Sequence, residues 1–256
     1  MSEVIYGIHA VSEALKRRER RFDYVAIAQD RDDPRVQRII EDCHSQSVPV
    51  RFVPRVEIDR STRTSTHQGV MAFTSSKKYG DIDDILENKH GKYAFLVVLD
   101  GVEDPHNLGA LLRSADGAGV DGVVIPERRA AGITGAVVKS SAGASEHLNV
   151  ARVVNIARTL EDLKDRNIWT VGLDERGGQN YDELDYNMDC AIVLGAEGKG
   201  LHELVRKKCD LLVSIPMAGA ISSLNVSVAG GIVMYEVLRQ RRARERGGDA
   251  SGKHSK

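Results

Sequence analysis

IPMAGAISSLNVSVA, residues 215–229, is the stretch that decides the fold. It starts as a buried strand that ends at a proline, continues through a loop of small residues and enters a helix. Ser222, Ser223 and Asn225 lie at the expected entry to that helix. Ser and Asn at such a junction commonly accept hydrogen bonds from the free N–H groups of the first helical turn. Three polar residues beside Gly219 also fit a ligand site, so capping and function both stay open here.

A second loop, GAEGKG at 195–200, follows the apolar strand AIVL and precedes a predicted helix. Open parallel sheets bind ligands where their strands end. The glycines of this loop would let backbone groups approach a ligand closely. Glu197 is then either a carboxylate of that site or a surface carboxylate on a tight turn.

A third loop, DPHNLGALLRSA at 104–115, also follows an apolar strand. Asn107 stands where an N-cap would, and Arg113 falls among the apolar residues of the next helix. Arg113 could extend its charge to solvent or pair with a carboxylate. Alternatively, its planar guanidinium suits a phosphate. Each of the three loops is weak by itself, but together they predict a site at one edge of a sheet.

Two nucleotide-binding motifs and a zinc motif are excluded by their context. GAGVDG at 117–122 has the spacing GxGxxG, but it ends a helix and leads into a strand, the reverse of a dinucleotide site. The 195–200 loop is not a phosphate-binding P-loop, because its lysine is misplaced and no Ser or Thr follows it. His202-Glu203 is not a zinc motif, because Arg206 occupies the position of the second histidine. We therefore expect no metal.

Composition limits the class of protein. The chain has 256 residues, of which 41% are hydrophobic, enough for one large or two modest domains. It has neither a run of about eighteen apolar residues nor an N-terminal apolar stretch of signal-peptide length. Its three cysteines are widely spaced and form no disulfide framework. We expect a cytoplasmic protein without a membrane span.

The net charge of −1 is lower than is usual for a protein that binds nucleic acid through broad electrostatics. Basic residues nevertheless concentrate at 16–21 and 239–246. Such runs are either solvated helix faces or local phosphate contacts, and composition does not decide between them.

Periodicity predicts an α/β chain in two parts. Residues 1–75 form a small α/β unit, 76–91 a polar linker with a helical turn in its middle, 92–246 the second domain and 247–256 a disordered tail. Apolar strands alternate with helices throughout 92–246, which predicts a mostly parallel sheet buried on both faces. The last helix of that domain is expected at about 224–244.

The three loops together resemble the signature motifs of the SpoU (TrmH) family of RNA 2′-O-ribose methyltransferases, of the SPOUT class. The matching segments are DPHNLGALLRSADGAGV, IVLGAEGKGL and IPMAGAISSLNVSVA, in that order. IYGIHAVSEAL at 5–15 and THQGVMA at 66–72 extend the resemblance over nearly the whole chain. It is most similar to the bacterial subgroup that methylates a guanosine of large-subunit (23S) ribosomal RNA.

The resemblance implies the fold, the cofactor and the site. The fold would contain a deep trefoil knot in the C-terminal sheet, after an RNA-binding domain that resembles ribosomal proteins. S-adenosylmethionine would lie in the knot. The residues implied for the cofactor are Leu173, Gly195, Gly198, Ile215 and Leu224; those implied for catalysis are Asn107, Arg113, Glu197, Ser223 and Asn225; those implied for RNA binding are His67, Gln68 and Arg113.

The resemblance also limits the mechanism. Members of the family are homodimers through the knot region and the C-terminal helix, and Gly230-Gly231 could serve that contact or simply pack inside the monomer. A guanidinium is a poor base, so we expect Arg113 to bind a phosphate and stabilise the developing alkoxide. Three alternatives stay open: a catalytically silent RNA-binding protein of this fold, a transfer RNA methyltransferase, and a drug-resistance ribosomal RNA methyltransferase.

Overall fold

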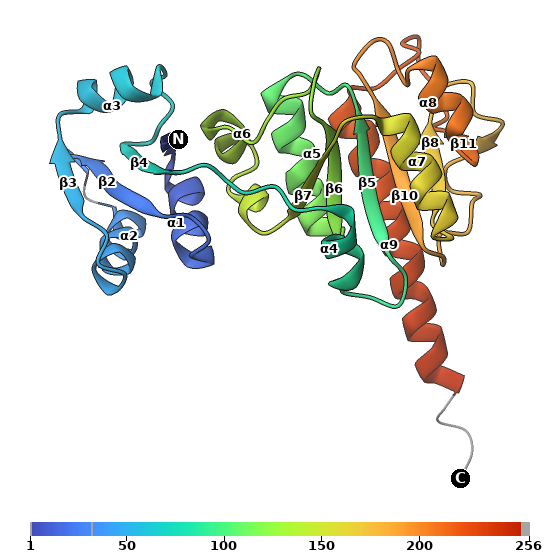
Figure 1. The fold of residues 1–256 in the computed structure, drawn as a ribbon, viewed down its shortest axis with the longest axis horizontal. Coiled ribbons are helices and arrows are strands. Elements are labelled where there is room, and N and C mark those ends of the chain that lie inside the picture. The colour runs from blue at the N-terminus through green and yellow to red at the C-terminus, as the bar shows by residue number, and fades with distance from the viewer. Residues whose placement is uncertain (1, 32, 252–256) are drawn as a thin grey trace. The chain divides into compact units, whose positions relative to one another are not determined.

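The computed structural model describes residues 2–31 and 33–251, which form two compact units (Figure 1). The first unit contains residues up to 78 together with the segments 104–113 and 131–147. The second contains 79–103, 114–130 and the residues from 148 onward. The helix α5 (Pro105–Ala118) therefore contributes its first turns to one unit and its last turns to the other.

The first unit has a four-stranded sheet in the order β1-β4-β2-β3. Its strands are β1 (Ser2–Tyr6), β2 (Phe22–Ala28), β3 (Val50–Val53) and β4 (Val70–Ser75), and only β2 and β3 pair in parallel among them. Helix α3 (Arg55–Thr62) packs through Ile58 on Ala26 and Met71. Because side chains alternate along a strand, Val25 and Ile27 face the other side, where α1 (Ile8–Arg17) and α2 (Pro34–Ser45) lie (Figure 1).

The second unit is built on a seven-stranded sheet in the order β7-β6-β5-β10-β8-β11-β9, in which every pairing is parallel. The strands are β5 (Phe95–Asp100), β6 (Gly122–Pro126), β7 (Asn149–Val153), β8 (Trp169–Leu173), β9 (Gln179–Asn180), β10 (Cys190–Gly195) and β11 (Leu211–Ser214). This sheet confirms the predicted α/β fold with a mostly parallel sheet.

Helices cover both faces of this sheet. On one face, Leu160 of α7 (Ile156–Asp165) and Val205 of α8 (Glu203–Lys208) pack against Val98 and its neighbours. The buried residues Val233 and Val237 belong to α9 (Val226–Ser251), which runs along the other face (Figure 1). Burial on both faces explains why the central strands are continuous apolar runs rather than alternating ones.

The predicted linker is not a plain tether. Residues 82–87 form the short helix α4, which Asp81 caps by accepting a hydrogen bond from Asp84 N at 2.8 Å. Ile85 is buried in the core of the second unit, and Gly80 N donates to Val150 O at 3.0 Å. Residues 79–91 are thus part of the second unit.

The C-terminal helix differs from the expectation at both ends. It begins at Val226, because residues 215–225 form a loop, and it extends to Ser251. Once a helix exists, each further residue adds one backbone hydrogen bond, so the backbone of 247–251 can continue it. The rest of the predicted disordered tail, 252–256, lies outside the described residues. Two short strands, β1 and β9, had no counterpart among the predicted elements.

Among residues 2–31 and 33–251, no helix combines the length and the apolar character that crossing a bilayer requires. The same part of the chain contains no cluster of three or more His, Cys, Asp or Glu side chains that could hold a metal ion.

Candidate functional site

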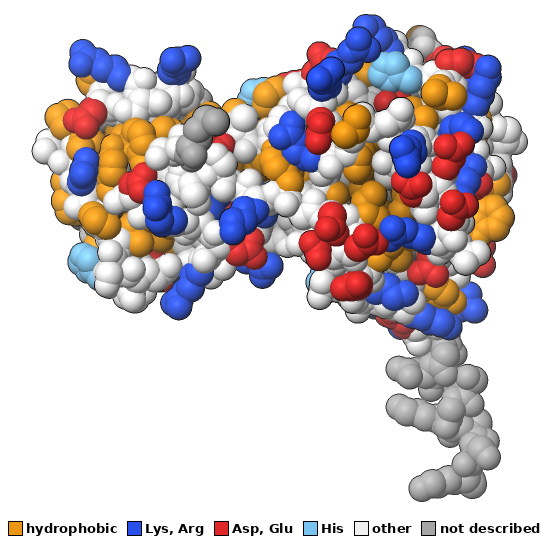
Figure 2. All heavy atoms as spheres, viewed as in Figure 1, with side chains coloured by type: hydrophobic (Ala, Val, Ile, Leu, Met, Phe, Trp, Pro, Cys, Tyr) orange, Lys and Arg blue, Asp and Glu red, His pale blue; other side chains and the backbone are white. Residues whose placement is uncertain are grey.

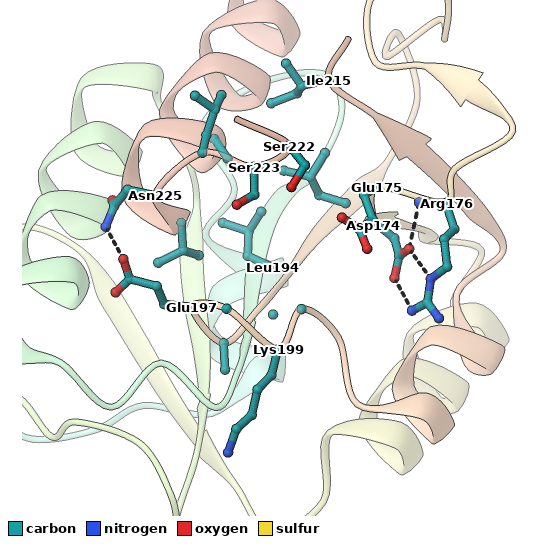
Figure 3. Close-up of a pocket in the computed structure, with 18 of the residues that line it drawn as sticks. Asp174, Glu175, Arg176, Leu194, Glu197, Lys199, Ile215, Ser222, Ser223 and Asn225 are labelled. Carbon is teal, nitrogen blue, oxygen red and sulfur yellow. Dashed lines mark hydrogen bonds and ion pairs between the residues drawn. The ribbon is translucent and has the colours of Figure 1, made fainter. Parts of the chain in front are cut away.

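A cavity of about 440 Å³ lies at the carboxyl ends of β8, β10 and β11 in the second unit (Figure 3). Three loops enclose it: 173–176 after β8, 194–200 at the end of β10, and 215–229 between β11 and the start of α9. Eight of the predicted site residues line it: Leu173, Gly195, Glu197, Gly198, Ile215, Ser223, Leu224 and Asn225. The parallel topology brings them together because strands that run the same way end at the same edge.

The 195–200 loop folds back on itself. Ala196 N donates to Gly200 O at 3.0 Å, and Gly200 N donates to Ala196 O at 2.9 Å. Gly198 and Gly200 have φ angles of 73° and 65°, which glycine adopts without the penalty of a side chain. A Cβ at Gly195 would overlap the Gly200 carbonyl. The glycine pattern therefore closes a tight backbone loop at the cavity.

Asn225 joins two walls of the cavity. Its side-chain amide donates from Nδ2 to Glu197 Oε1 at 3.0 Å (Figure 3). Its Oδ1 accepts from Ser227 N at 2.9 Å and from Ser227 Oγ at 2.6 Å, which caps the first turn of α9. Capping thus falls to Asn225, whereas Ser222 and Ser223 lie in the loop before the helix. Capping uses the oxygen of the Asn225 amide group, and contact with Glu197 uses its nitrogen.

The loop after β8 adds residues that the sequence interpretation missed. Asp174 accepts from Arg176 N and Nε, both at 2.9 Å, and from Arg176 Nη2 at 3.1 Å. These hydrogen bonds lower the pKa of the Asp174 carboxyl below its usual value. Asp174, Glu175 and Arg176 all line the cavity (Figure 3). These residues directly follow an apolar strand, as the other two loops of the cavity do. That shared position could have identified them from the sequence.

Asn107 and Arg113 lie on α5 in the first unit. Because Pro105 fits the first position of a helix, α5 starts before Asn107, and Asp104 takes the capping position instead, accepting from His106 N at 3.0 Å. Asn107 is buried in the first turn, not at the N-cap as expected, and Arg113 is exposed.

His67 and Gln68 hold the loop between α3 and β4. His67 is fully buried; its Nε2 is 2.8 Å from Asp59 Oδ1, and its Nδ1 accepts from Gly69 N at 2.9 Å. Gln68 Oε1 accepts from Ile8 N at 3.1 Å and from Lys139 Nζ at 2.7 Å. Their predicted contact with RNA remains a prediction, while the structure gives both a role in fixing the loop.

Charge is mixed on one face of the second unit. Figure 2 shows Lys and Arg side chains interspersed with Asp and Glu on the visible face of the second unit. A mixed surface gives little long-range attraction to a polyanion. Any nucleic-acid contact through this face would therefore depend on individual basic side chains.

The cavity lies at the carboxyl edge of a parallel sheet, which is where open α/β domains commonly bind ligands. Residues 94–235 match the SpoU rRNA Methylase family, and residues 4–80 match the domain described as RNA 2′-O ribose methyltransferase substrate binding. The chain belongs to the SpoU rRNA methylase family, as its motifs predicted.

Relatives cover nearly the whole chain. It is 44% identical over 244 residues to the 23S rRNA (guanosine-2′-O-)-methyltransferase RlmB of Pectobacterium atrosepticum, covering 94% of this chain and 99% of that protein. It is also 44% identical over 241 residues to the putative TrmH family tRNA/rRNA methyltransferase YacO of Bacillus subtilis, covering 93% and 96%.

Solved structures share the fold. The SpoU methyltransferase AviRb from Streptomyces viridochromogenes, crystallised with AdoMet, superposes with a TM-score of 0.79 at 24% identity, covering 94% of this chain and 91% of that one. The TrmH/SpoU tRNA modifying enzyme of A. aeolicus gives 0.55 at 29% identity, over 63% and 81% of the two chains.

Proposed function

We propose that this protein transfers a methyl group from S-adenosylmethionine to the ribose 2′-hydroxyl of a guanosine in 23S ribosomal RNA. The observation that carries the proposal is the pocket in which the GAEGKG loop and the 215–229 loop are joined by the hydrogen bond from Asn225 to Glu197. The RlmB relatives, which match almost end to end, supply the substrate.

The pocket suits S-adenosylmethionine in size and lining. Its volume lies within the range of small-molecule sites, about 300–1,000 Å³. Leu173, Ile215 and Leu224 give apolar walls suited to the adenine ring, and the exposed backbone at Gly198 leaves room for a polar group. When bound, the cofactor supplies a methyl group on a positively charged sulfur.

The chain's own residues would prepare the hydroxyl. The ribose oxygen forms a bond to the methyl carbon as the sulfur–methyl bond breaks, and the hydroxyl proton passes to the neighbouring phosphate or to water. Arg113 binds that phosphate and stabilises the oxygen as its negative charge develops. Asn107, Ser223 and Asn225 fix the ribose and the loop. Glu197 holds Asn225 in place through the hydrogen bond between them.

The function is tested by mapping ribose methylation. Purified protein with S-adenosylmethionine should methylate one guanosine of unmodified 23S ribosomal RNA, and that methyl group should be missing in a strain that lacks the gene. Transfer RNA forms the second arm, because the YacO relative is named for both RNAs. Methylation of transfer RNA alone would replace the proposed substrate, and binding of 23S RNA without methylation would indicate a silent RNA-binding protein.

We also propose the finer features that the family resemblance implies. They are a deep trefoil knot formed by the loops at the carboxyl edge of the second sheet, an N-terminal domain (1–75) that resembles ribosomal proteins and binds RNA, a connecting segment (76–91) that packs on the domain 92–246 rather than hanging free, and a cytoplasmic location.

We propose a homodimer through the 215–225 loop and α9. Val228 and Tyr235 are 50% and 51% exposed, and their spacing places them on one face of α9. Ile221 adds a 73% exposed apolar side chain from the loop. Gly231 faces α5 within the chain, where an added Cβ would be 3.6 Å from Ser114 Oγ, an ordinary contact distance.

We expect Val228→Glu to shift the protein from dimer to monomer in sedimentation velocity, because a charge would be buried in an apolar contact. Leu204→Glu, on the exposed side of α8, is the matched control and should leave the dimer intact. A wild-type protein that sediments as a monomer at micromolar concentration would contradict the proposed dimer.

A further inference from the structure

We infer that Glu146 is a positioning residue: it fixes the N-terminal domain (residues 2–31 and 33–78) to the segment 131–147, and thereby to the first turns of α5. The inference rests on the proposed function, since it assigns to this contact the delivery of RNA to Asn107 and Arg113. All the residues involved belong to the first compact unit.

The contact centres on a buried ion pair. Arg20, after the end of α1, donates from Nε to Glu146 Oε2 at 2.8 Å and from Nη2 to Glu146 Oε1 at 2.9 Å. The two side chains are 1% and 2% exposed. This paired geometry is the strongest that Arg and a carboxylate form, and it fixes direction as well as distance. It joins residues 126 positions apart in the sequence.

Further charges surround the pair. Arg20 Nη1 also donates to Glu3 Oε2 at 2.8 Å, and Lys77 Nζ donates to the backbone oxygen of Glu146 at 3.3 Å. Burial alone would lower the pKa of Arg20, but its hydrogen bonds to Glu146 and Glu3 raise that pKa above the usual value. Burial lowers the pKa of Lys77. The charges of these two cations and two carboxylates cancel only while the N-terminal domain stays against Glu146.

Close packing accompanies the charges. Helix α6 (Gly135–Ser140) lies against β1, where a Cβ at Gly135 would overlap the Val4 carbonyl oxygen. Gly143 leaves similarly little room, since an added Cβ would be 2.8 Å from Glu13 Cβ and 3.1 Å from His9 O. Any residue larger than glycine at position 135 or 143 would push the segment 131–147 away from the N-terminal domain. The contact is therefore a packed interface and not an occasional encounter.

The same segment reaches α5. A Cβ at Gly109 would overlap the Ser140 hydroxyl oxygen, so α6 and the first turns of α5 touch directly. Ser140 Oγ also donates to Pro105 O at 3.0 Å. The path from the N-terminal domain runs through Arg20 and Glu146 to α6, and from Ser140 to the part of α5 that carries Asn107 and Arg113.

A fixed contact changes what the N-terminal domain contributes. A domain on a free tether only raises the local concentration of its RNA, whereas a domain held in place also sets the direction and distance of the target nucleotide. Loss of the contact would therefore affect a long RNA that engages both parts. Methylation of a short hairpin that carries only the target nucleotide would not change when the contact is lost.

The test uses the full chain with Glu146→Arg, which places a second cation against Arg20 without altering the N-terminal domain itself. Glu146→Gln is the milder variant, and Glu161→Arg is the matched charge reversal, at a surface pair with Lys208. Three quantities are measured: hydrogen exchange of the peptides 2–8 and 134–147, affinity for S-adenosylmethionine by calorimetry, and kcat/KM on a long 23S fragment and on the short hairpin.

We expect Glu146→Arg to raise hydrogen exchange in both peptides and to lower kcat/KM on the long RNA by about tenfold, mainly through KM. Cofactor affinity and activity on the hairpin should not change, and Glu161→Arg should behave as wild type. Unchanged exchange would overturn the inference, as would raised exchange with unchanged kcat/KM on long RNA, or an equal loss on both RNAs. A wild-type protein inactive on both RNAs would overturn the proposed function instead, while exchange still reports the contact.

Discussion

Gly195→Ala is expected to weaken binding of S-adenosylmethionine at least 100-fold, which corresponds to about 2.7 kcal/mol. The reason is steric. An added methyl group at residue 195 would overlap the Gly200 carbonyl, and the 196–200 loop is closed by two backbone hydrogen bonds, so it cannot move aside without opening. The open loop would no longer form a wall of the cavity. Isothermal titration calorimetry on the purified variant measures the change directly.

Gly178→Ala is the matched control for this substitution. An added Cβ at Gly178 meets no atom within 4 Å, and its φ is not in the left-handed region. We expect its cofactor affinity to stay within about twofold of wild type, with circular dichroism confirming that both variants fold. If Gly195→Ala bound the cofactor as tightly as Gly178→Ala, the 195–200 loop would not belong to the cofactor site.

Arg113→Lys is expected to lower kcat by about 100-fold or more, the usual loss when one donor to a developing oxyanion is removed. Lysine keeps the positive charge, but it lacks the planar pair of N–H groups that can grip two phosphate oxygens. Affinity for S-adenosylmethionine should not change. Single-turnover methylation of 23S RNA, measured alongside cofactor titration, separates the two effects.

Arg158→Lys, at an exposed position early in α7, provides the control for the loss of an arginine. It should retain full turnover. Near-wild-type turnover by Arg113→Lys with intact cofactor binding would show that the bidentate role proposed for Arg113 is wrong, and that a point charge is sufficient.

The alternation of apolar strands and helices was enough to predict the second sheet and the edge at which its loops meet. The pocket followed from this, because parallel strands place the segments after Leu173, Leu194 and Ser214 together wherever they lie in the chain. Strand β9 escaped prediction because two residues cannot show a period. Asp174 escaped because a single carboxylate after a strand looks like an ordinary turn residue until its partner Arg176 is seen.

Individual side-chain roles were harder to infer than the architecture. Asn225 both caps α9 and bonds Glu197, and only coordinates show that one amide does both. His67 is a polar residue in a loop, which suggests exposure, yet its two ring nitrogens are satisfied inside the protein. Glu146 pairs with Arg20, which is 126 positions away in the sequence, and no local sequence pattern predicts that pairing.

The strand order of the second unit has a consequence for how the chain acquires its shape. Strand β10 pairs with β5, and Cys190 lies opposite Phe95. This central pairing joins two strands that are far apart in the sequence. Closing so long a loop is entropically costly, and proteins dominated by distant pairings fold slowly. During synthesis on the ribosome, the edge of β5 that pairs with β10 stays unpaired until β10 has been made. The cavity, whose walls extend to Ala229, therefore forms late in biogenesis, after most of the protein has left the exit tunnel.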